Sequence, residues 1–257
     1  MIAQIFAIAN EKGGVAKTTT AVHLGHALAQ RGKKVLVVDI DPQSNATSWI
    51  GADRPAAVLA NVLLNPALAA EAIAMSTAKG IDLLWSTRDT AGAGDDLRNF
   101  PAPAVALRRA LRTINGRYDV ILIDCAPGLG IVTINGIVAA NGIIAPVDSG
   151  SMAVAGLEQL SITIAELVEA ELMPAAIPVT ALVTRYDGRL ALAKSVLEHI
   201  DNSGIPRFET VIRNGTKVGQ APGFERTLFD LDPKDNVALD YASLAEEIAL
   251  ALEPAHV

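Results

Sequence analysis

Short segments that are apolar on both faces alternate with helical segments along the chain, and this alternation constrains the fold most strongly. Strands buried between two layers of helices have this character, because neither face of such a strand meets water. The predicted strands are residues 2–9, 34–40, 81–85, 120–124, 142–147 and 177–184. The predicted helices are residues 17–30, 104–115, 131–141, 152–172, 189–201 and 241–252. We therefore expect an α/β fold with a mostly parallel, twisted sheet and helices on both faces.

Composition and charge exclude several classes of protein. The chain is 51% hydrophobic, too apolar for disorder, and 4% aromatic, too few for a protein that stacks single-stranded bases. One cysteine, Cys125, excludes a disulfide framework or an iron–sulfur cluster held within one chain. His23 and His26 lack a third ligand nearby, which favours ordinary packing or surface histidines over metal binding. The formal net charge of −7 requires any nucleic-acid contact to come from a local patch.

Two stretches have less regular patterns, and a third could be mistaken for a membrane span. Residues 53–78 predict short helices over one sheet edge, and residues 87–103 predict a surface loop around one helical turn. The uncharged stretch between Asp124 and Asp148 contains prolines and glycines that interrupt it, so it predicts a buried helix and strand. With neither an interdomain linker nor a signal-peptide pattern in residues 1–257, we expect one soluble, cytoplasmic domain.

A glycine-rich loop carries the clearest functional signal. Residues 10–19, Asn-Glu-Lys-Gly-Gly-Val-Ala-Lys-Thr-Thr, follow the first predicted strand and open the first predicted helix. Small residues let backbone N–H groups converge on phosphates, and the helix N-terminus adds partial positive charge. In such a loop Lys17 reaches the β- and γ-phosphates, and the Thr18 hydroxyl binds Mg²⁺. The common G-x-x-x-x-G-K-[ST] spacing fails at Glu11 and Ala16, and the alternative is a turn with two solvated lysines.

Two further motifs place carboxylates at the ends of apolar strands. Asp39 and Asp41 lie in Val-Val-Asp-Ile-Asp-Pro-Gln-Ser-Asn, where alternation puts both side chains on one face. Asp124 ends the strand in Val-Ile-Leu-Ile-Asp-Cys-Ala-Pro. Carboxylates beside a triphosphate are unfavourable unless a cation or a polarised water uses them. Either motif alone could consist of ordinary strand-end aspartates.

Together these motifs resemble those of the ParA/MinD superfamily of ATPases. Residues 12–18 resemble its deviant Walker A motif, residues 39–45 its Asp-x-Asp-Pro-Gln-Gly-Asn motif, and residues 124–127 the end of its Walker B motif. The likeness to short, Soj-type ParA proteins, which lack a helix-turn-helix extension before the loop, covers nearly the whole chain. Ala16 and Ser44 replace glycines of the family patterns. At Ala16 we expect a negative φ, with the methyl group away from the phosphates.

The resemblance implies ATP and Mg²⁺ as cofactors and gives roles to individual residues. Lys12, at the signature-lysine position, is implied to act on the ATP of a second subunit, and Asp41 to orient the attacking water. The alternative for Lys12 is a general increase in local positive potential. The implied nucleotide-binding residues are Gly13, Gly14, Val15, Ala16, Lys17, Thr18, Thr19, Thr184 and Arg185. The implied metal shell is Thr18, Asp39 and Asp124, and the implied DNA contacts are Arg189 and Lys217.

The resemblance also implies partners. An ATP-bound homodimer sits on non-specific double-stranded DNA of the nucleoid, and a ParB-like or cargo adaptor stimulates hydrolysis. Residues 185–226 hold seven basic and five acidic residues, a small local excess that suits weak phosphate binding. A MinD-like membrane cycle is disfavoured, because residues 227–257 hold one lysine and seven acidic residues. A dethiobiotin-synthetase-like ligase, which needs no Lys12, stays as an alternative, and the cargo could be a plasmid, a chromosome or a protein assembly.

Overall fold

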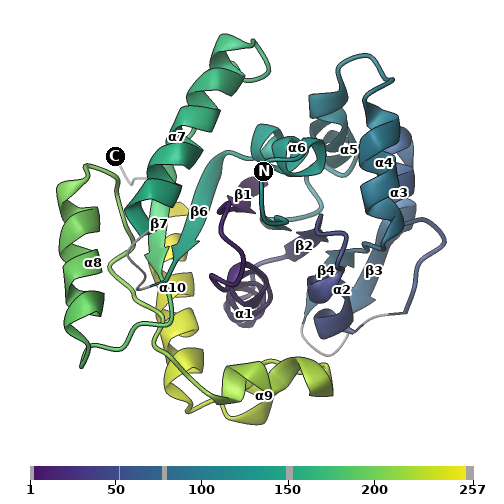
Figure 1. Cartoon of the computed structure of the whole chain (residues 1–257). Helices are drawn as coiled ribbons and strands as arrows, with labels where there is room; N and C mark the ends of the chain where they lie inside the picture. The colour runs from purple at the N-terminus through teal and green to yellow at the C-terminus, as the bar shows by residue number, and fades with distance from the viewer. Residues whose placement is uncertain (1–2, 52, 77–79, 149–152, 253–257) are drawn as a thin grey trace, which may run out of the picture.

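The computed structural model describes residues 3–51, 53–76, 80–148 and 153–252. Within them, seven strands form one sheet in the order β3-β4-β2-β5-β1-β6-β7 (Figure 1). All neighbouring strands are parallel except β3 and β4, so the predicted mostly parallel α/β fold is confirmed. The strands are β1 Gln4–Ile8, β2 Val35–Asp39, β3 Ile73–Ser76, β4 Ile81–Leu84, β5 Val120–Asp124, β6 Gly142–Val147 and β7 Val179–Val183.

Helices connect the strands and cover both faces of the sheet. The α-helices are α1 Lys17–Gln30, α2 Asn45–Ile50, α3 Leu59–Leu64, α4 Asp89–Leu97, α5 Ala106–Thr113, α6 Ile131–Ala139, α7 Ala153–Glu169, α8 Ala191–Asn202, α9 Leu228–Leu231 and α10 Asn236–Leu252. The short 3₁₀ helices are η1 Pro66–Ala72, η2 Pro103–Val105, η3 Lys217–Gly219 and η4 Ala221–Phe224. Among the described helices, none combines the length and apolar character that crossing a membrane requires.

The central strands supply side chains to two separate cores. In β5, Val120 and Leu122 enter the core formed with α1 and α10, whereas Ile121 and Ile123 enter the core formed with α5 and α6. Figure 1 shows α1 and α10 on one side of the sheet and α5 and α6 on the other. Because both faces of β2, β5 and β6 are buried in this way, the sequences of these strands are apolar apart from the aspartates that end β2 and β5.

Three elements differ from the prediction. Short helices are found in the stretch 53–78, but residues Ile73–Ser76 form β3, which pairs antiparallel with β4 at the sheet edge. Asp89–Leu97 form a nine-residue helix rather than a loop around one turn. Gly94 allows this helix to approach α6, since a Cβ at that position would lie 2.9 Å from Val132.

Helix α10 begins five residues earlier than predicted, at Asn236. The predicted limits at Ile2, Ala78 and Met152 lie outside the described residues.

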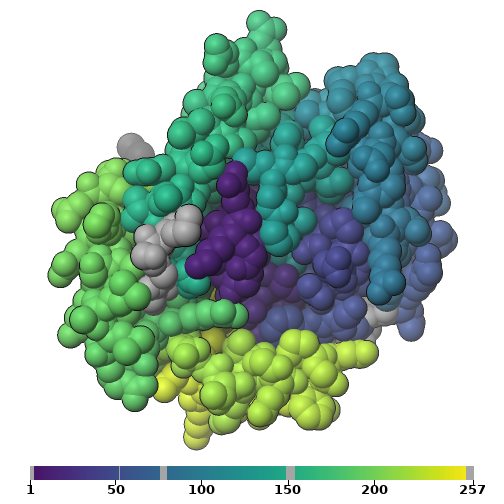
Figure 2. Space-filling model, viewed as in Figure 1, coloured from purple at the N-terminus to yellow at the C-terminus, as the bar shows by residue number. Residues whose placement is uncertain are grey.

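The carboxyl ends of β1, β2, β5 and β6 meet at one edge of the sheet. Ile8 at the end of β1 is the register partner of both Asp124 in β5 and Ile144 in β6, and Asp39 in β2 is the partner of Asp124. Ligands of open parallel sheets bind at this edge. Figure 2 shows the purple N-terminal segment at the centre of one face, between green and blue segments of the chain.

Candidate nucleotide-binding and catalytic site

The loop between β1 and α1 encloses the side chain of Lys17, which is only 7% exposed. The Lys17 Nζ donates hydrogen bonds to the backbone oxygens of Asn10 at 2.9 Å and Lys12 at 2.8 Å. Burial lowers the pKa of Lys17, and the nearby negative charge of Asp124 opposes this shift. The loop therefore holds a cation beside the N-terminus of α1, where a phosphate group is stabilised.

Two residues that replace family glycines adopt the left-handed conformation typical of glycine. Ala16, which directly precedes α1, has φ 71° and ψ 29°, and Ser44, which precedes α2, has φ 55°. The expectation of a negative φ at Ala16 is therefore wrong. A side chain in this region costs about 1–2 kcal/mol, because Cβ crowds the following carbonyl. The loop keeps its shape in spite of this strain, and Gly14 at φ 77° has the same conformation without it.

The first carboxylate motif fixes the loop that carries Asp41. Asp39 is fully buried, and its two oxygens accept hydrogen bonds from the backbone N–H groups of Asp41 at 3.1 Å and Thr47 at 2.8 Å. Burial raises the pKa of Asp39 to about 6, against the lowering effect of these hydrogen bonds. Asp41 is 8% exposed, and its Oδ1 accepts from the N–H of Gln43 at 2.9 Å. Asp39 thus positions the backbone around Asp41.

The second motif leaves a buried carboxylate without a partner. Neither oxygen of Asp124 has a hydrogen bond of ordinary geometry with the described residues. Burial and then the charge of Asp39 raise its pKa well above the usual range, although the nearby Thr18 hydroxyl acts in the opposite direction. Such a group is unfavourable unless a cation neutralises it. The site therefore fits a cation that Asp124 and Thr18 hold on one side.

The donor set suits Mg²⁺ in particular. Magnesium sites in nucleotide-binding proteins use one or two protein groups together with phosphate oxygens and water, rather than a cage of side chains. Thr18 and Asp124 fit this pattern directly, and Asp39 lies beside Asp124 on the neighbouring strand.

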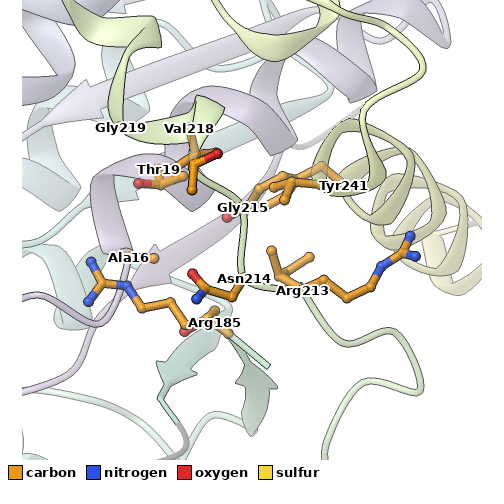
Figure 3. Close-up of a pocket in the computed structure, with 13 residues that line it drawn as sticks. Ala16, Thr19, Arg185, Arg213, Asn214, Gly215, Val218, Gly219 and Tyr241 are labelled. Carbon is orange, nitrogen blue, oxygen red and sulfur yellow. The ribbon is translucent and has the colours of Figure 1, made fainter. Parts of the chain in front are cut away.

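A pocket of about 340 Å³ opens beside the loop (Figure 3). It is lined by Ala16, Thr19, Thr184 and Arg185 and by residues 212–216, 218 and 219. The volume lies within the range of small-molecule sites. In Figure 3 the side chain of Arg185 extends towards Ala16. Thr184 and Arg185, both predicted from the sequence, therefore lie where a group attached to loop-bound phosphates would reach.

Lys12 differs from Lys17 in its environment. Its side chain is 46% exposed, and its Nζ lies 2.9 and 2.8 Å from the two carboxylate oxygens of Asp148, which follows β6.

Asn10, which the sequence did not single out, also joins the loop to β6. Its Nδ2 donates to the Pro146 oxygen at 2.8 Å, and its Oδ1 accepts from the Lys12 N–H at 3.0 Å. The only signal for Asn10 is a polar residue directly after a buried strand.

A buried network behind the loop was also missed. Leu228 N–H donates to His23 Nε2 at 3.1 Å, so Nδ1 carries the proton and donates to the Thr19 oxygen at 3.0 Å. Burial lowers the pKa of His23 to about 4. His26 Nδ1 lies 2.7 Å from the Thr227 hydroxyl. The two histidines therefore connect α1 to the start of α9, and of the packing or surface positions expected from the sequence the structure shows packing.

Arg189 and Lys217, the predicted DNA contacts, lie outside the loop site. Arg189 lines a second cavity of about 630 Å³ together with Thr216, the residue that precedes Lys217. Each cation is paired with a carboxylate: Arg189 with Asp187 at 2.7 Å and Lys217 with Asp232 at 2.5 Å. Hydrogen bonding to Arg189 lowers the pKa of Asp187 to about 2. The excess of basic over acidic residues counted for 185–226 is therefore effectively smaller, because Asp232, which pairs with Lys217, lies outside that segment.

The remaining predicted residues meet at the loop. Val15 is buried, and its carbonyl oxygen lies 3.1 Å from the Thr184 hydroxyl, while Gly13 and Gly14 are exposed. A Cβ at Gly13 would lie 3.9 Å from Pro127, so the loop approaches the end of the second carboxylate motif. The structure thus brings together Lys12, Gly13, Gly14, Val15, Ala16, Lys17, Thr18, Thr19, Asp39, Asp41, Asp124, Thr184 and Arg185.

Comparison with known proteins identifies the family. A family model described as an AAA domain matches residues 3–175. The chromosome-partitioning ATPase Soj of Thermus thermophilus is 39% identical over 250 residues, covering 97% of this chain and 96% of that protein. The chromosome partitioning protein ParA of Caulobacter vibrioides is 35% identical over 250 residues, covering 95% of this chain and 93% of that protein.

Solved structures agree on the fold. A crystal structure of cobyrinic acid a,c-diamide synthase from Mycobacterium smegmatis with bound ADP and magnesium superposes with a TM-score of 0.83 at 31% identity. The match covers 96% of this chain and 94% of that one. The three sequence motifs, the site that they form and the identity to the Soj and ParA relatives all indicate the same family. The chain belongs to the ParA/Soj family of partitioning ATPases, within the ParA/MinD superfamily.

Proposed function

We propose that two ATP-bound copies of this chain form a dimer in which Lys12 of each copy contacts the ATP of the other. The difference between the two loop lysines carries this proposal. Lys17 is buried and bonded to its own loop, whereas Lys12 is half-exposed at the loop surface. Only a cation at the surface is accessible to a second chain. Such a lysine stabilises the charge that develops during phosphoryl transfer and makes hydrolysis depend on assembly.

Within each copy, the loop residues 13–19 bind the phosphates of ATP through backbone N–H groups and Lys17. Thr18 and Asp124 hold Mg²⁺ with the nucleotide, with Asp39 beside them, and the ion neutralises phosphate charge. Asp41 orients the water that attacks the γ-phosphate. The pocket beside the loop, lined by Thr184 and Arg185, receives the adenosine part.

The ATP-bound dimer binds double-stranded DNA without sequence preference through Arg189 and Lys217. Dimerisation doubles the number of these cations on one particle, which strengthens binding to a polyanion. An adaptor bound to the cargo stimulates hydrolysis and releases the dimer, so the protein works on the nucleoid in the cytoplasm. The names of its Soj and ParA relatives favour a chromosome as cargo.

One relative's name favours a different function. The Mycobacterium smegmatis protein is named as an amide-forming synthase, which agrees with the alternative of a metabolic ligase. A ligase would hydrolyse ATP only with its small-molecule substrate and would not require DNA or a second copy of Lys12. The exposed position of Lys12 favours the partitioning function.

DNA retention separates these possibilities. The chain is passed over immobilised non-specific DNA without nucleotide, with ADP, or with ATP and Mg²⁺, and liposomes of anionic lipid serve as the membrane control. We expect retention on DNA only with ATP, and less of it at higher salt. Arg189→Glu with Lys217→Glu should abolish retention, whereas Arg98→Glu, at an exposed arginine directly after α4, should not. Retention on liposomes, or equal retention of all variants, would contradict the proposal.

A further inference from the structure

The phosphate loop is attached to the neighbouring strand β6 at two points. In the parallel pair of β1 and β6, Ile8 is the register partner of Ile144, and the Ala9 N–H bonds to the Ile144 oxygen. Continuing this register places the loop beside the residues that follow Ile144. Asn10 bonds to the Pro146 oxygen, and the Lys12 side chain bonds to Asp148. Both contacts join residues 136 positions apart, so the side chains extend the strand pairing into the loop.

The contact between Lys12 and Asp148 is a close ion pair in which the lysine contacts both carboxylate oxygens. The Nζ lies almost equally close to both carboxylate oxygens, at 2.9 and 2.8 Å, and Asp148 is more enclosed than Lys12, with 23% against 46% of the side chain exposed. Asp148 directly follows β6, whereas Lys12 belongs to the loop. The carboxylate therefore holds the lysine against its own subunit.

We propose that Asp148 is a positioning residue that holds Lys12 in its own subunit until a second ATP-bound copy replaces the carboxylate with phosphate. This inference rests on the proposed function of Lys12 between subunits. The cation must leave Asp148 before it can reach the phosphates of the partner, so the ion pair opposes dimerisation. A half-exposed pair is weak, and its loss should shift the dimerisation constant by roughly two- to fivefold.

The first test measures the position of Lys12 without nucleotide. The rate at which acetic anhydride modifies the Lys12 amine is followed by peptide mass spectrometry in the wild type, Asp148→Asn and Asp148→Glu. Asparagine keeps the size of the side chain but removes the charge, whereas glutamate restores the charge. We expect faster modification in Asp148→Asn and a return towards the wild-type rate in Asp148→Glu. Asp201→Asn, which breaks an exposed pair with Arg207, should leave Lys12 unchanged.

The second test measures dimerisation with ATP and Mg²⁺ by sedimentation. Asp148→Asn should dimerise at a concentration about two- to fivefold lower than the wild type, and Asp148→Glu should lie between them. Equal modification of Lys12 in all variants would overturn the positioning role, whatever the state of the dimer. Faster modification with unchanged dimerisation would also overturn it. If the wild type itself stays monomeric with ATP, the proposed function fails, and the modification rates still show separately whether Asp148 holds Lys12.

Discussion

The nucleotide edge and the proposed DNA-binding segment both place cations beside carboxylates, but they do so in opposite environments. At the nucleotide edge, Lys17 and Asp124 are buried, and Asp124 has no hydrogen-bond partner among the described residues. In the segment that carries Arg189 and Lys217, both cations are exposed and paired with carboxylates. The first region contains a buried carboxylate that a bound cation would neutralise, whereas in the second each cation must exchange the carboxylate with which it is paired.

This difference predicts how the two regions respond to change. Buried charges interact through a medium of low polarity and are poorly screened, so substitutions there have large effects that salt hardly alters. Exposed ion pairs contribute little free energy and are screened by salt, so substitutions there have small effects. Four predictions test the comparison, from the largest effect to the smallest.

Substitution of Asp41 should have the largest effect. Asp41→Ala removes the group proposed to orient the attacking water, and loss of such a group slows turnover by about 100-fold or more. ATP binding should persist, because Lys17 and Thr18 remain. Phosphate release and the binding of a fluorescent ATP analogue measure the two properties. Wild-type turnover in this variant would remove Asp41 from the catalytic site and weaken the distinction between the regions.

The buried network behind the loop should make stability depend on pH. The pKa of His23 is about 4 in the folded chain, below its ordinary value of 6.5, so its contribution is present above pH 6.5 and is lost as the pH falls towards 4. Between pH 7 and pH 5 this loss amounts to about 2 kcal/mol.

Unfolding by urea at both pH values measures the effect. Because burial raises the pKa of Asp39 to about 6, that group acts in the opposite direction, and the comparison must be made between variants. The loss between pH 7 and pH 5 should be about 2 kcal/mol smaller in His23→Asn than in the wild type, and unchanged in His199→Asn. Equal losses in all three proteins would show that His23 is not buried in its neutral form.

Backbone strain in the loop gives a smaller effect. Ala16→Gly should relieve the strain at φ 71°, which stabilises the folded protein by about 1 kcal/mol. Glycine also makes the unfolded chain more flexible, and this gain in entropy offsets part of the stabilisation. Gly14→Ala should have the opposite sign, because φ is 77° and nothing else lies within 4 Å of the added Cβ. Thermal unfolding of the two variants measures both effects. A destabilising Ala16→Gly would mean that Ala16 is not in the left-handed conformation.

The smallest effect is expected in the exposed segment. Asp187→Asn and Asp232→Asn should each raise the affinity of the ATP-bound protein for DNA by roughly two- to fivefold, because each frees a cation from its partner. Asp95→Asn, which removes an exposed carboxylate near Arg98, should have no effect. Fluorescence anisotropy with a labelled duplex at two salt concentrations measures the affinities. A large effect that persists at high salt would contradict the comparison.

Most of the fold could be predicted because the strands are buried on both faces. The segments 120–124, 142–147 and 17–30 were predicted with the bounds that the structure has. The edge strand β3 was missed because it is only four residues long and follows an alanine-rich stretch, and pairing with β4 determines it. The helix over 89–97 was missed because two glycines suggested a loop, although Gly94 serves close packing against α6.

The candidate site could be predicted where it consists of local motifs. The loop and the strand-end carboxylates form short patterns whose positions follow from the parallel sheet. The partner of Lys12 could not be predicted, because Lys12 and Asp148 lie 136 residues apart and no pattern links them. The conformation of Ala16 also escaped prediction, because the surrounding loop imposes a backbone shape that alanine does not prefer.

The central claim is that a second copy of the chain completes the ATP site with Lys12, and mixing two inactive variants tests it most directly. Asp41→Ala and Lys12→Ala chains are combined in equal amounts, and ATP hydrolysis is measured with DNA and the adaptor. Half of the dimers are then mixed, and each mixed dimer has one complete site, so we expect about a quarter of the wild-type rate. A mixture as inactive as its components would show that Lys12 acts within its own subunit and would contradict the account.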